Sequence, residues 1–321
     1  MHSFEELSRE FTGRFDTRHF PSDPSSLYEP AGYFLSIGGK RVRPILCLMG
    51  NELFGEISPD AWPAAIAVEL FHNFTLIHDD IMDKAPIRRG MPTVHEKYGS
   101  PTALLAGDVM LVVAYDYLNR IGGGPIHEIL QLFNRTARQV CEGQQIDMDF
   151  EKKFSVDLNE YLHMIELKTS VLLAASLQMG AILGGAGKGN QQHIFEFGRN
   201  LGLAFQIQDD YLDAFGDPAK FGKQLGGDIV ANKKTFLLVK AMEVANSAQY
   251  EDIRLLLETD IPDKVQQMLH LFRVCGVDAW ARALKENYIK TAFRHLEEIA
   301  VISSRKEPLR KLAEFLVQRE Y

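Results

Sequence analysis

Three aspartates, Asp79, Asp80 and Asp83, stand together at the end of a mostly apolar stretch of the sequence. If this stretch is helical, the i, i+1, i+4 spacing places Asp79 and Asp83 on one face, with Asp80 beside them. Carboxylates this close repel one another near pH 7 unless a cation lies among them, and an all-oxygen cluster suits a hard divalent ion such as Mg²⁺. The pattern therefore predicts a metal site at the end of a helix.

The same pattern occurs a second time, because Asp209, Asp210 and Asp213 also follow an apolar stretch. A single DDxxD sequence is most often a solvated helix end. Carboxylates beside a hydrophobic core are costly, however, unless they are paired or bind metal. The repetition favours a functional role, and we expect the two clusters to face each other across a cavity.

Basic residues close to the first cluster indicate an anionic ligand. Arg88 and Arg89 follow the aspartates, and cations beside metal-binding acids suit a polyanion that bridges both, such as a diphosphate. A second basic stretch, IGGKRVRP at 37–44, contains Lys40 and Arg43 and comes directly before an apolar helix. A tight basic turn at a helix start can bind an anion, although alone this signal is weak.

The elements that must position these residues are all helical. Hydrophobic periodicity and breaker residues predict one helix beginning near Pro30, a loop over 85–98, and helical patterns from 233 onward. Further helices are predicted over 3–15, 45–53, 61–84, 102–120, 125–147, 158–183 and 191–215. No strand is expected, so the sequence predicts an all-α fold with one domain over 1–321.

The composition limits the possible partners and compartment. The 321 residues are 46% hydrophobic and 24% charged, with a net charge of −8 and no long basic tract, which argues against nucleic acid. The three cysteines are far apart in the sequence, which favours a reducing cytoplasm without disulfide or zinc. The N-terminus is not a signal sequence and no run of eighteen apolar residues occurs, so we expect a cytoplasmic protein without a membrane span.

Six motifs in order over nearly the whole chain resemble the trans-isoprenyl diphosphate synthases, also called polyprenyl synthetases, which include the farnesyl and geranylgeranyl diphosphate synthases. The motifs are GGKRVRP, HNFTLIHDDIMDKAPIRRG, GQQID, LKTS, FQIQDDYLD and FGKQLGGDIVANKKT. The resemblance implies a helical bundle around a central cavity, a homodimer, and head-to-tail condensation of isopentenyl diphosphate with an allylic diphosphate. The chain departs from some members by lacking a basic C-terminal tail.

The resemblance also implies roles for single residues. Asp79 and Asp83 would hold two Mg²⁺ ions and Asp209 a third, with Mn²⁺ as a substitute. Asp80, Asp210 and Asp213 would support these ions directly or through water.

The substrate residues are likewise implied by the resemblance. The allylic diphosphate would be bound by Arg88, Lys168, Lys223 and Lys233. Isopentenyl diphosphate would be bound without metal by Lys40, Arg43, His72 and Arg89. The carbonyl of Lys168, with Thr169 and Gln206, would offer oxygen lone pairs to an allylic cation.

Product length is expected to depend on bulky residues upstream of the first cluster. Phe74 is the fifth residue before Asp79, Thr75 the fourth and Phe71 the eighth. At 1.5 Å per residue Phe74 lies about 7.5 Å along the helix axis from Asp79, which leaves room for a few isoprene units of about 5 Å. A helical wheel places Thr75 nearer than Phe74 to the line along the helix on which Asp79 lies. The assignment of Phe74 as the limiting residue therefore depends more on the resemblance than on geometry. The resemblance favours a twenty-carbon over a fifteen-carbon product.

Two other functions share parts of this pattern. A terpene cyclase ionises the same substrates, but its second metal motif is usually built from Asn, Ser and Glu rather than a second DDxxD. A non-catalytic partner subunit typically lacks some metal aspartates or the basic loop, and both are intact here.

Overall fold

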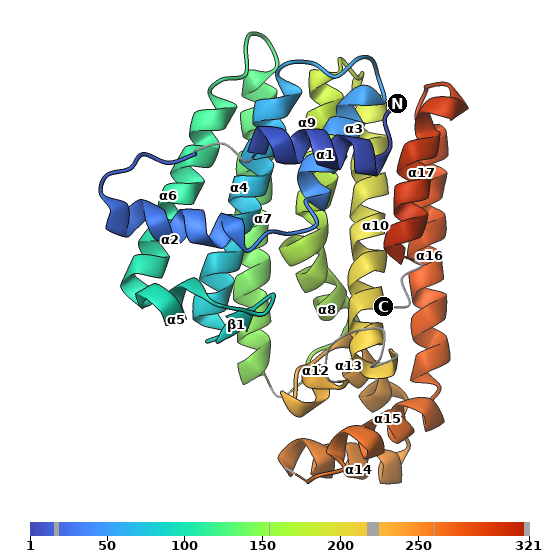
Figure 1. The fold of residues 1–321 in the computed structure, drawn as a ribbon. Coiled ribbons are helices and arrows are strands. Elements are labelled where there is room, and N and C mark those ends of the chain that lie inside the picture. The colour runs from blue at the N-terminus through green and yellow to red at the C-terminus, as the bar shows by residue number, and fades with distance from the viewer. Residues whose placement is uncertain (16–18, 154, 217–224, 260, 318–321) are drawn as a thin grey trace. The chain divides into compact units, whose positions relative to one another are not determined.

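The computed structural model describes residues 1–15, 19–153, 155–216, 225–259 and 261–317. The prediction of an all-α fold is confirmed, because the described elements are helices apart from one short hairpin (Figure 1). The chain packs into two compact units. Unit 1 comprises Met1–Arg135, Ala175–Ile194 and Ala300–Pro308, and unit 2 comprises Thr136–Ala174, Phe195–Ile299 and Leu309–Tyr321. The single domain and the central cavity stay predictions.

Unit 1 is built around the helix that carries the first aspartate cluster. Its own helices are α1 (Phe4–Phe15), α2 (Ser25–Ser36), α3 (Val42–Glu52), α4 (Ala61–Met82), α5 (Val94–Tyr98) and α6 (Ser100–Leu118). Helix α4 packs against α3 and α6. Its side chains are buried almost all round from Ala61 to Leu70, as expected for a helix in the middle of a core.

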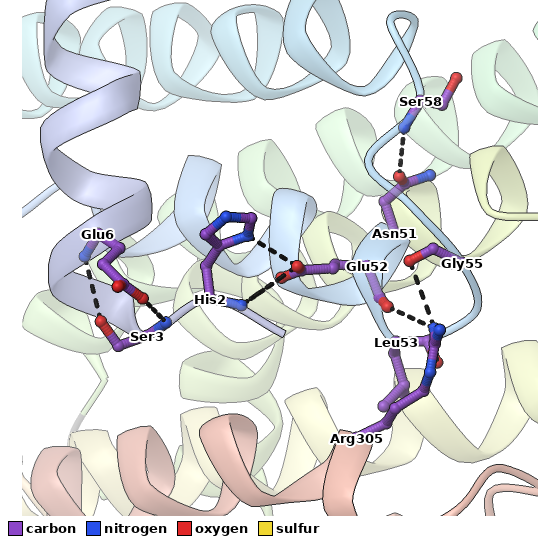
Figure 2. A network of polar contacts seen from close by, with 9 residues as sticks. All are labelled: His2, Ser3, Glu6, Asn51, Glu52, Leu53, Gly55, Ser58 and Arg305. Carbon is purple, nitrogen blue, oxygen red and sulfur yellow. Dashed lines mark hydrogen bonds and ion pairs between the residues drawn. The ribbon is translucent and has the colours of Figure 1, made fainter.

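The first residues of the chain and the last segment of unit 1, Ala300–Pro308, contact the end of α3. The backbone N–H of His2 donates to both carboxylate oxygens of Glu52, at 3.1 and 2.9 Å (Figure 2). Arg305 Nη1 donates to the carbonyls of Glu52 and Leu53, at 3.0 and 3.4 Å, and to that of Gly55 at 3.3 Å. Carbonyls at a helix end have no partner within the helix, so these contacts stabilise the end of α3.

Unit 2 contains the second aspartate cluster and the C-terminal helices. Its own elements are α8 (Leu158–Ile165), the π-helix η1 (Glu166–Ser170), α12 (Gly227–Val230), α13 (Phe236–Val244), α14 (Ser247–Glu258), α15 (Lys264–Val274) and α16 (Val277–Glu298). Four of the five boundaries between the units fall within α7 (Ile126–Lys152), α9 (Val171–Leu183), α10 (Lys188–Phe215) and α17 (Ser303–Val317). The fifth lies between Ile299 and Ala300, after the end of α16.

Two glycines allow α7 and α10 to approach the π-helical turn closely. A Cβ atom on Gly143 of α7 would lie 2.3 Å from the backbone nitrogen of Lys168. A Cβ atom on Gly202 of α10 would lie 2.7 Å from Cα of Ser170. Both distances are shorter than atoms tolerate, so the close contact of η1 with both helices requires glycine at these positions.

Several local features differ from expectation, including α5, which lies within the predicted loop, and the ends of several helices. Helix α2 begins at Ser25, directly after Pro24, and contains Pro30, which removes one hydrogen-bond donor without ending the helix. Part of the predicted loop over 85–98 forms an antiparallel hairpin of β1 (Ile87–Arg88) and β2 (Met91–Pro92). The predicted helix over 158–183 is continuous but passes through η1.

Two helical stretches are long and apolar enough to span a membrane by length and composition alone. The first is Leu158–Leu183, and 78% of its most apolar segment is buried inside the protein, as is usual for a core helix. The second is Ser100–Leu118, of which 44% is buried.

Candidate active site

The first aspartate cluster lies at the C-terminal end of α4. Asp79 is half-buried and Asp83 is exposed, and the two follow each other on successive turns. Asp80 is 1% exposed and faces the protein instead. The Nε atom of Arg88 donates to both of its carboxylate oxygens at 2.9 Å, and Arg88 Nη2 lies 2.8 Å from Oδ1. The cluster thus has two accessible carboxylates and one that holds an arginine.

The second cluster, at the end of α10, divides in the same way. Asp209 is exposed and Asp213 is partly buried, whereas Asp210 is 5% exposed. Asp210 accepts hydrogen bonds from the hydroxyl of Tyr161 and from Gln206 Nε2, the latter at 2.9 Å. Burial raises the pKa of Asp210 to about 7, although both hydrogen bonds and Lys233 oppose the shift.

The donor atoms of each cluster suit a hard divalent ion. Within the described ranges, no three His, Cys, Asp or Glu side chains are grouped closely enough to hold a metal by themselves. Mg²⁺ is commonly bound by one or two carboxylates together with water and substrate phosphates. The accessible pairs, Asp79 with Asp83 and Asp209 with Asp213, provide such carboxylates, so the residues fit Mg²⁺.

A basic group lies in unit 1, on and beside the same helix α4. Arg43, in the first turn of α3, donates from Nη1 to Nε2 of His72 on α4 at 3.0 Å. The guanidinium of Arg89 lies against Gly39, where a Cβ atom would be 2.8 Å from Nη1. Lys40 is exposed at the neighbouring position of the loop. The structure therefore brings Arg43, His72 and Arg89 into one neighbourhood.

The charge of this group is strongly positive, which affects His72 and Arg43. Burial, followed by the charges of Arg43, Arg89, Arg88 and Arg41, holds the pKa of His72 well below its usual range. Burial also lowers the pKa of Arg43 to about 10. His72 is therefore neutral near pH 7, and its Nε2 accepts the hydrogen bond from Arg43.

The π-helical turn η1 carries two of the predicted catalytic residues. Lys168 Nζ lies 2.6 Å from Oδ2 of Asp147 on α7. Thr169 Oγ1 donates to Gln206 Oε1 at 3.4 Å, and Gln206 in turn donates to Asp210. Thr169, Gln206 and Asp210 thus form a hydrogen-bonded chain, and Lys168 forms a separate ion pair with Asp147. Turns of π-helix occur frequently at functional sites.

The short helix α12 adds an acidic residue, Asp228, that sequence reasoning did not assign. The backbone N–H of Asp228 donates to Oδ2 of Asp213 at 3.0 Å, and its carboxylate lies 3.8 Å from Lys233 Nζ. Burial raises the pKa of Asp228, Lys233 lowers it, and Asp213, Asp147 and Asp209 raise it. Lys233 therefore lies among these carboxylates. Lys223, also predicted to bind substrate, is outside the described residues.

Two of the residues expected to limit product length, Phe71 and Phe74, belong to a buried aromatic cluster. The rings of Phe71 and Phe74 are 5.6 Å apart, and Phe71 meets the edge of Phe133 on α7 at 5.2 Å. Phe71 is 1% exposed and Phe74 is 9% exposed. Thr75 turns its hydroxyl back to its own helix, where it donates to the carbonyl of His72 at 2.8 Å.

Sequence reasoning also missed the partners that hold the site residues in place. Asp147 lies within the quoted GQQID motif and Asp228 within FGKQLGGDIVANKKT, so the motifs contained a signal for both. Tyr161 and Glu69 lie in no such pattern. Their contacts connect helices that are distant in the sequence.

The comparisons with known proteins identify the family. The polyprenyl synthetase family model matches residues 24–273. The chain is 38% identical over 299 residues to the short chain isoprenyl diphosphate synthase of Methanothermobacter thermautotrophicus, covering 93% of this chain and 92% of the relative. It is 37% identical over 300 residues to the geranylgeranyl diphosphate synthase of Methanosarcina mazei, covering 93% and 91%.

The fold agrees with this assignment. A crystal structure of a geranylgeranyl pyrophosphate synthase superposes with a TM-score of 0.93 at 41% identity and covers 100% of both chains. The resemblance found in the six motifs is confirmed by all of these comparisons. The protein belongs to the polyprenyl synthetase family and is a prenyltransferase.

Proposed function

We propose that the protein condenses isopentenyl diphosphate with an allylic diphosphate and releases geranylgeranyl diphosphate and diphosphate. The observation that best supports this function is the arrangement of two different anion-binding environments along α4. His72, with Arg43 and Arg89 nearby, lies two turns before Asp79, which is about 10 Å along the helix axis. The environment at Asp79 offers carboxylates for metal ions, and the environment at His72 offers cations. This arrangement suits two diphosphate substrates that react with each other.

The allylic substrate must ionise, and the leaving diphosphate needs most of the stabilisation. Members of this family use Mg²⁺, which when bound supplies Lewis-acid stabilisation of the departing oxygens. Asp79 and Asp83 would hold two ions and Asp209 a third, with Mn²⁺ as a substitute. Arg88, fixed by Asp80, and Lys233 would bind the same diphosphate.

The allylic cation is proposed to meet oxygen atoms of unit 2. Gln206 has its amide nitrogen directed to Asp210 and its amide oxygen directed to Thr169. This orientation offers oxygen lone pairs rather than N–H groups to a cation near Thr169. The carbonyl of Lys168 would contribute a third oxygen, and Asp147 holds the side chain of Lys168.

The two alternative functions are weaker. The accessible carboxylates Asp209 and Asp213 belong to a full second DDxxD motif, which favours chain elongation over cyclisation. The intact aspartates and basic loop also argue against a non-catalytic subunit.

Incubation with Mg²⁺, isopentenyl diphosphate and an allylic diphosphate tests the function directly. We expect elongation that stops when Mg²⁺ is chelated. Asp79→Asn and Asp209→Asn should each reduce kcat by at least 100-fold, which is about 2.7 kcal/mol of transition-state stabilisation, because each removes a charged oxygen ligand from a different metal site. Asp252→Asn, an exposed aspartate of α14, is the matched control and should act as wild type. Ionisation of the allylic diphosphate at the wild-type rate in both motif variants would contradict the two-site mechanism.

A twenty-carbon product is proposed, with Phe74 as the residue that would block extension toward Phe71. The Phe74→Ala variant should give longer products, limited next by the ring of Phe71, which is itself supported by Phe133. Chromatography of the dephosphorylated products against prenyl alcohol standards measures this change. If the product distribution of the variant equals that of the wild type, another helix closes the pocket.

The protein is further proposed to be a cytoplasmic homodimer. The apolar side chains Leu104, Leu105 and Val112 of α6 are 49%, 56% and 59% exposed, and a second copy would cover this face. Sedimentation of the wild type at dimer mass and of Val112→Lys at monomer mass would support the homodimer. A wild-type monomer at micromolar concentration would contradict it.

A further inference from the structure

The basic loop before α3 contains an arginine, Arg41, that differs from its neighbours in what it contacts. Its Nη1 atom lies 2.5 Å from Oε1 of Glu69, and its Nη2 donates to the carbonyl of Leu35 at 3.1 Å. The guanidinium also lies over the ring of Phe15, 4.7 Å from the centroid. The side chain of Arg41 is 11% exposed and that of Glu69 is 4% exposed. Two donors and one face of this guanidinium are therefore used inside the protein.

The backbone conformation around Arg41 needs contacts that hold it in place. Arg41 has a left-handed conformation, with φ of 50°, directly before the first turn of α3. Gly38 has a φ of 81°. A non-glycine residue rarely adopts a positive φ unless its surroundings fix it. The turn that places Lys40 on one side of Arg41 and Arg43 on the other thus depends on contacts made by Arg41.

Glu69 is well placed to provide this contact. It lies on α4, one turn before His72, and its Oε1 also accepts from Asn73 Nδ2 at 2.9 Å. A buried carboxylate beside an anion-binding group would weaken binding by repulsion if it were not paired. Because Glu69 is paired with Arg41, the two together carry no net charge.

We propose that Arg41 and Glu69 are positioning residues of the isopentenyl diphosphate site, which hold the 38–43 loop so that Lys40 and Arg43 converge on the diphosphate. The pair itself does not touch the substrate. The inference takes the identity of the ligand from the proposed function, whereas the anchoring of the loop does not depend on it.

The double variant Arg41→Met/Glu69→Gln separates geometry from charge. It removes one positive and one negative group, so the net charge near the ligand is unchanged, and the amide oxygen that replaces the Glu69 carboxylate can still accept from Asn73. Calorimetry with isopentenyl diphosphate in the absence of metal should show a dissociation constant at least tenfold higher than for wild type. The KM for the allylic substrate should stay within twofold. Unchanged affinity in the folded double variant would overturn the proposal.

A matched control makes the same exchange on the surface of the same unit. Lys188 and Glu128 form an ion pair with side chains 75% and 35% exposed. The Lys188→Met/Glu128→Gln variant should bind isopentenyl diphosphate as the wild type does. An equal loss of affinity in this control would show that the effect is not specific to the anchor.

The single variant Arg41→Lys keeps the charge and serves if the double variant does not fold. Lysine has no planar fork and cannot donate to both Glu69 and Leu35 in the same geometry, so we expect weakened binding here as well. Wild-type affinity of Arg41→Lys for isopentenyl diphosphate would show that the positive charge alone suffices. It would overturn the proposal that Arg41 anchors the loop.

Hydrogen exchange distinguishes this inference from the proposed function. Without any substrate, the amides of 37–43 should exchange faster in Arg41→Lys than in the wild type. Equal exchange rates would refute the anchor whatever the enzyme does. If the wild type fails to elongate allylic diphosphates, the proposed function is wrong, and the exchange rates still decide whether Arg41 holds the loop.

Discussion

Replacing Gly143 with alanine tests how accurately the π-helical turn must be placed. The new Cβ atom would lie 2.3 Å from Lys168 N and 2.8 Å from the carbonyl carbon of Leu167. An ordinary contact begins at 3.4 Å, so the turn must move away from α7 by about 3.4 minus 2.3, or roughly 1 Å. These neighbours are backbone atoms, so no side-chain rotation can relieve the overlap.

This shift should reduce catalysis far more than stability. Overpacking of a core costs about 1–3 kcal/mol, which a chain of this size tolerates. A displacement of about 1 Å at reacting groups can cost about 100-fold in rate. Since the proposed catalytic residues Lys168 and Thr169 are on the moving turn, we expect kcat of Gly143→Ala to fall about 100-fold. The KM for isopentenyl diphosphate, which we propose is bound by residues of unit 1, should change little.

Steady-state kinetics with both substrates, together with circular dichroism to measure the folded fraction, check this expectation. The matched control is Gly189→Ala in the first turn of α10, where an added Cβ atom has no heavy atom within 4 Å. The control should retain wild-type kinetics. A folded Gly143→Ala enzyme whose kcat is within threefold of the wild type would refute the reasoning that η1 must stay in contact with α7.

Two further predictions concern the basic group of unit 1. Arg43→Gln and Arg89→Gln should each raise the KM for isopentenyl diphosphate about 10- to 150-fold, because a hydrogen bond to a charged group contributes about 1.5–3 kcal/mol, and a larger effect on the allylic KM would mean that the two pockets are reversed. The depressed pKa of His72 means that the unfolded chain takes up a proton below about pH 6.5 that the folded protein does not, so stability is lost as pH falls. Between pH 7.5 and 5.5 the wild type should lose more unfolding free energy than His72→Gln, as measured by urea unfolding, and equal losses would contradict a depressed pKa of His72.

The helices and the accessible carboxylate pairs could be predicted because they depend on local spacing. An i, i+4 pair lies on one face of any helix, so Asp79 and Asp83 had to be neighbours once α4 was recognised from its apolar residues. The boundary at Lys84 was wrong by two residues, since α4 ends at Met82. Helix ends depend on weak local contacts and are the least predictable part of an element.

The π-helical turn and the loop anchor could not be predicted from local spacing. The sequence ELKTS is compatible with an ordinary α-helix, and the close contacts of η1 with Gly143 and Gly202 come from helices that are distant in the sequence. Arg41 and Arg43 are both basic residues of one short loop. Only the buried carboxylate of Glu69, 28 residues away from Arg41, shows which of the two arginines is paired with an acidic side chain.

The second aspartate of each DDxxD motif, Asp80 or Asp210, is buried and has a different partner in each unit. The residue after the first aspartate is rotated about 100° around the helix, toward the core in both motifs. In unit 1 this residue, Asp80, meets Arg88, whose own loop forms the β1–β2 hairpin. In unit 2 it is Asp210, which meets Tyr161 and Gln206. Because a buried carboxylate requires a partner, each motif uses its middle aspartate to fix a different group: a predicted diphosphate-binding arginine in one unit and a predicted catalytic amide in the other.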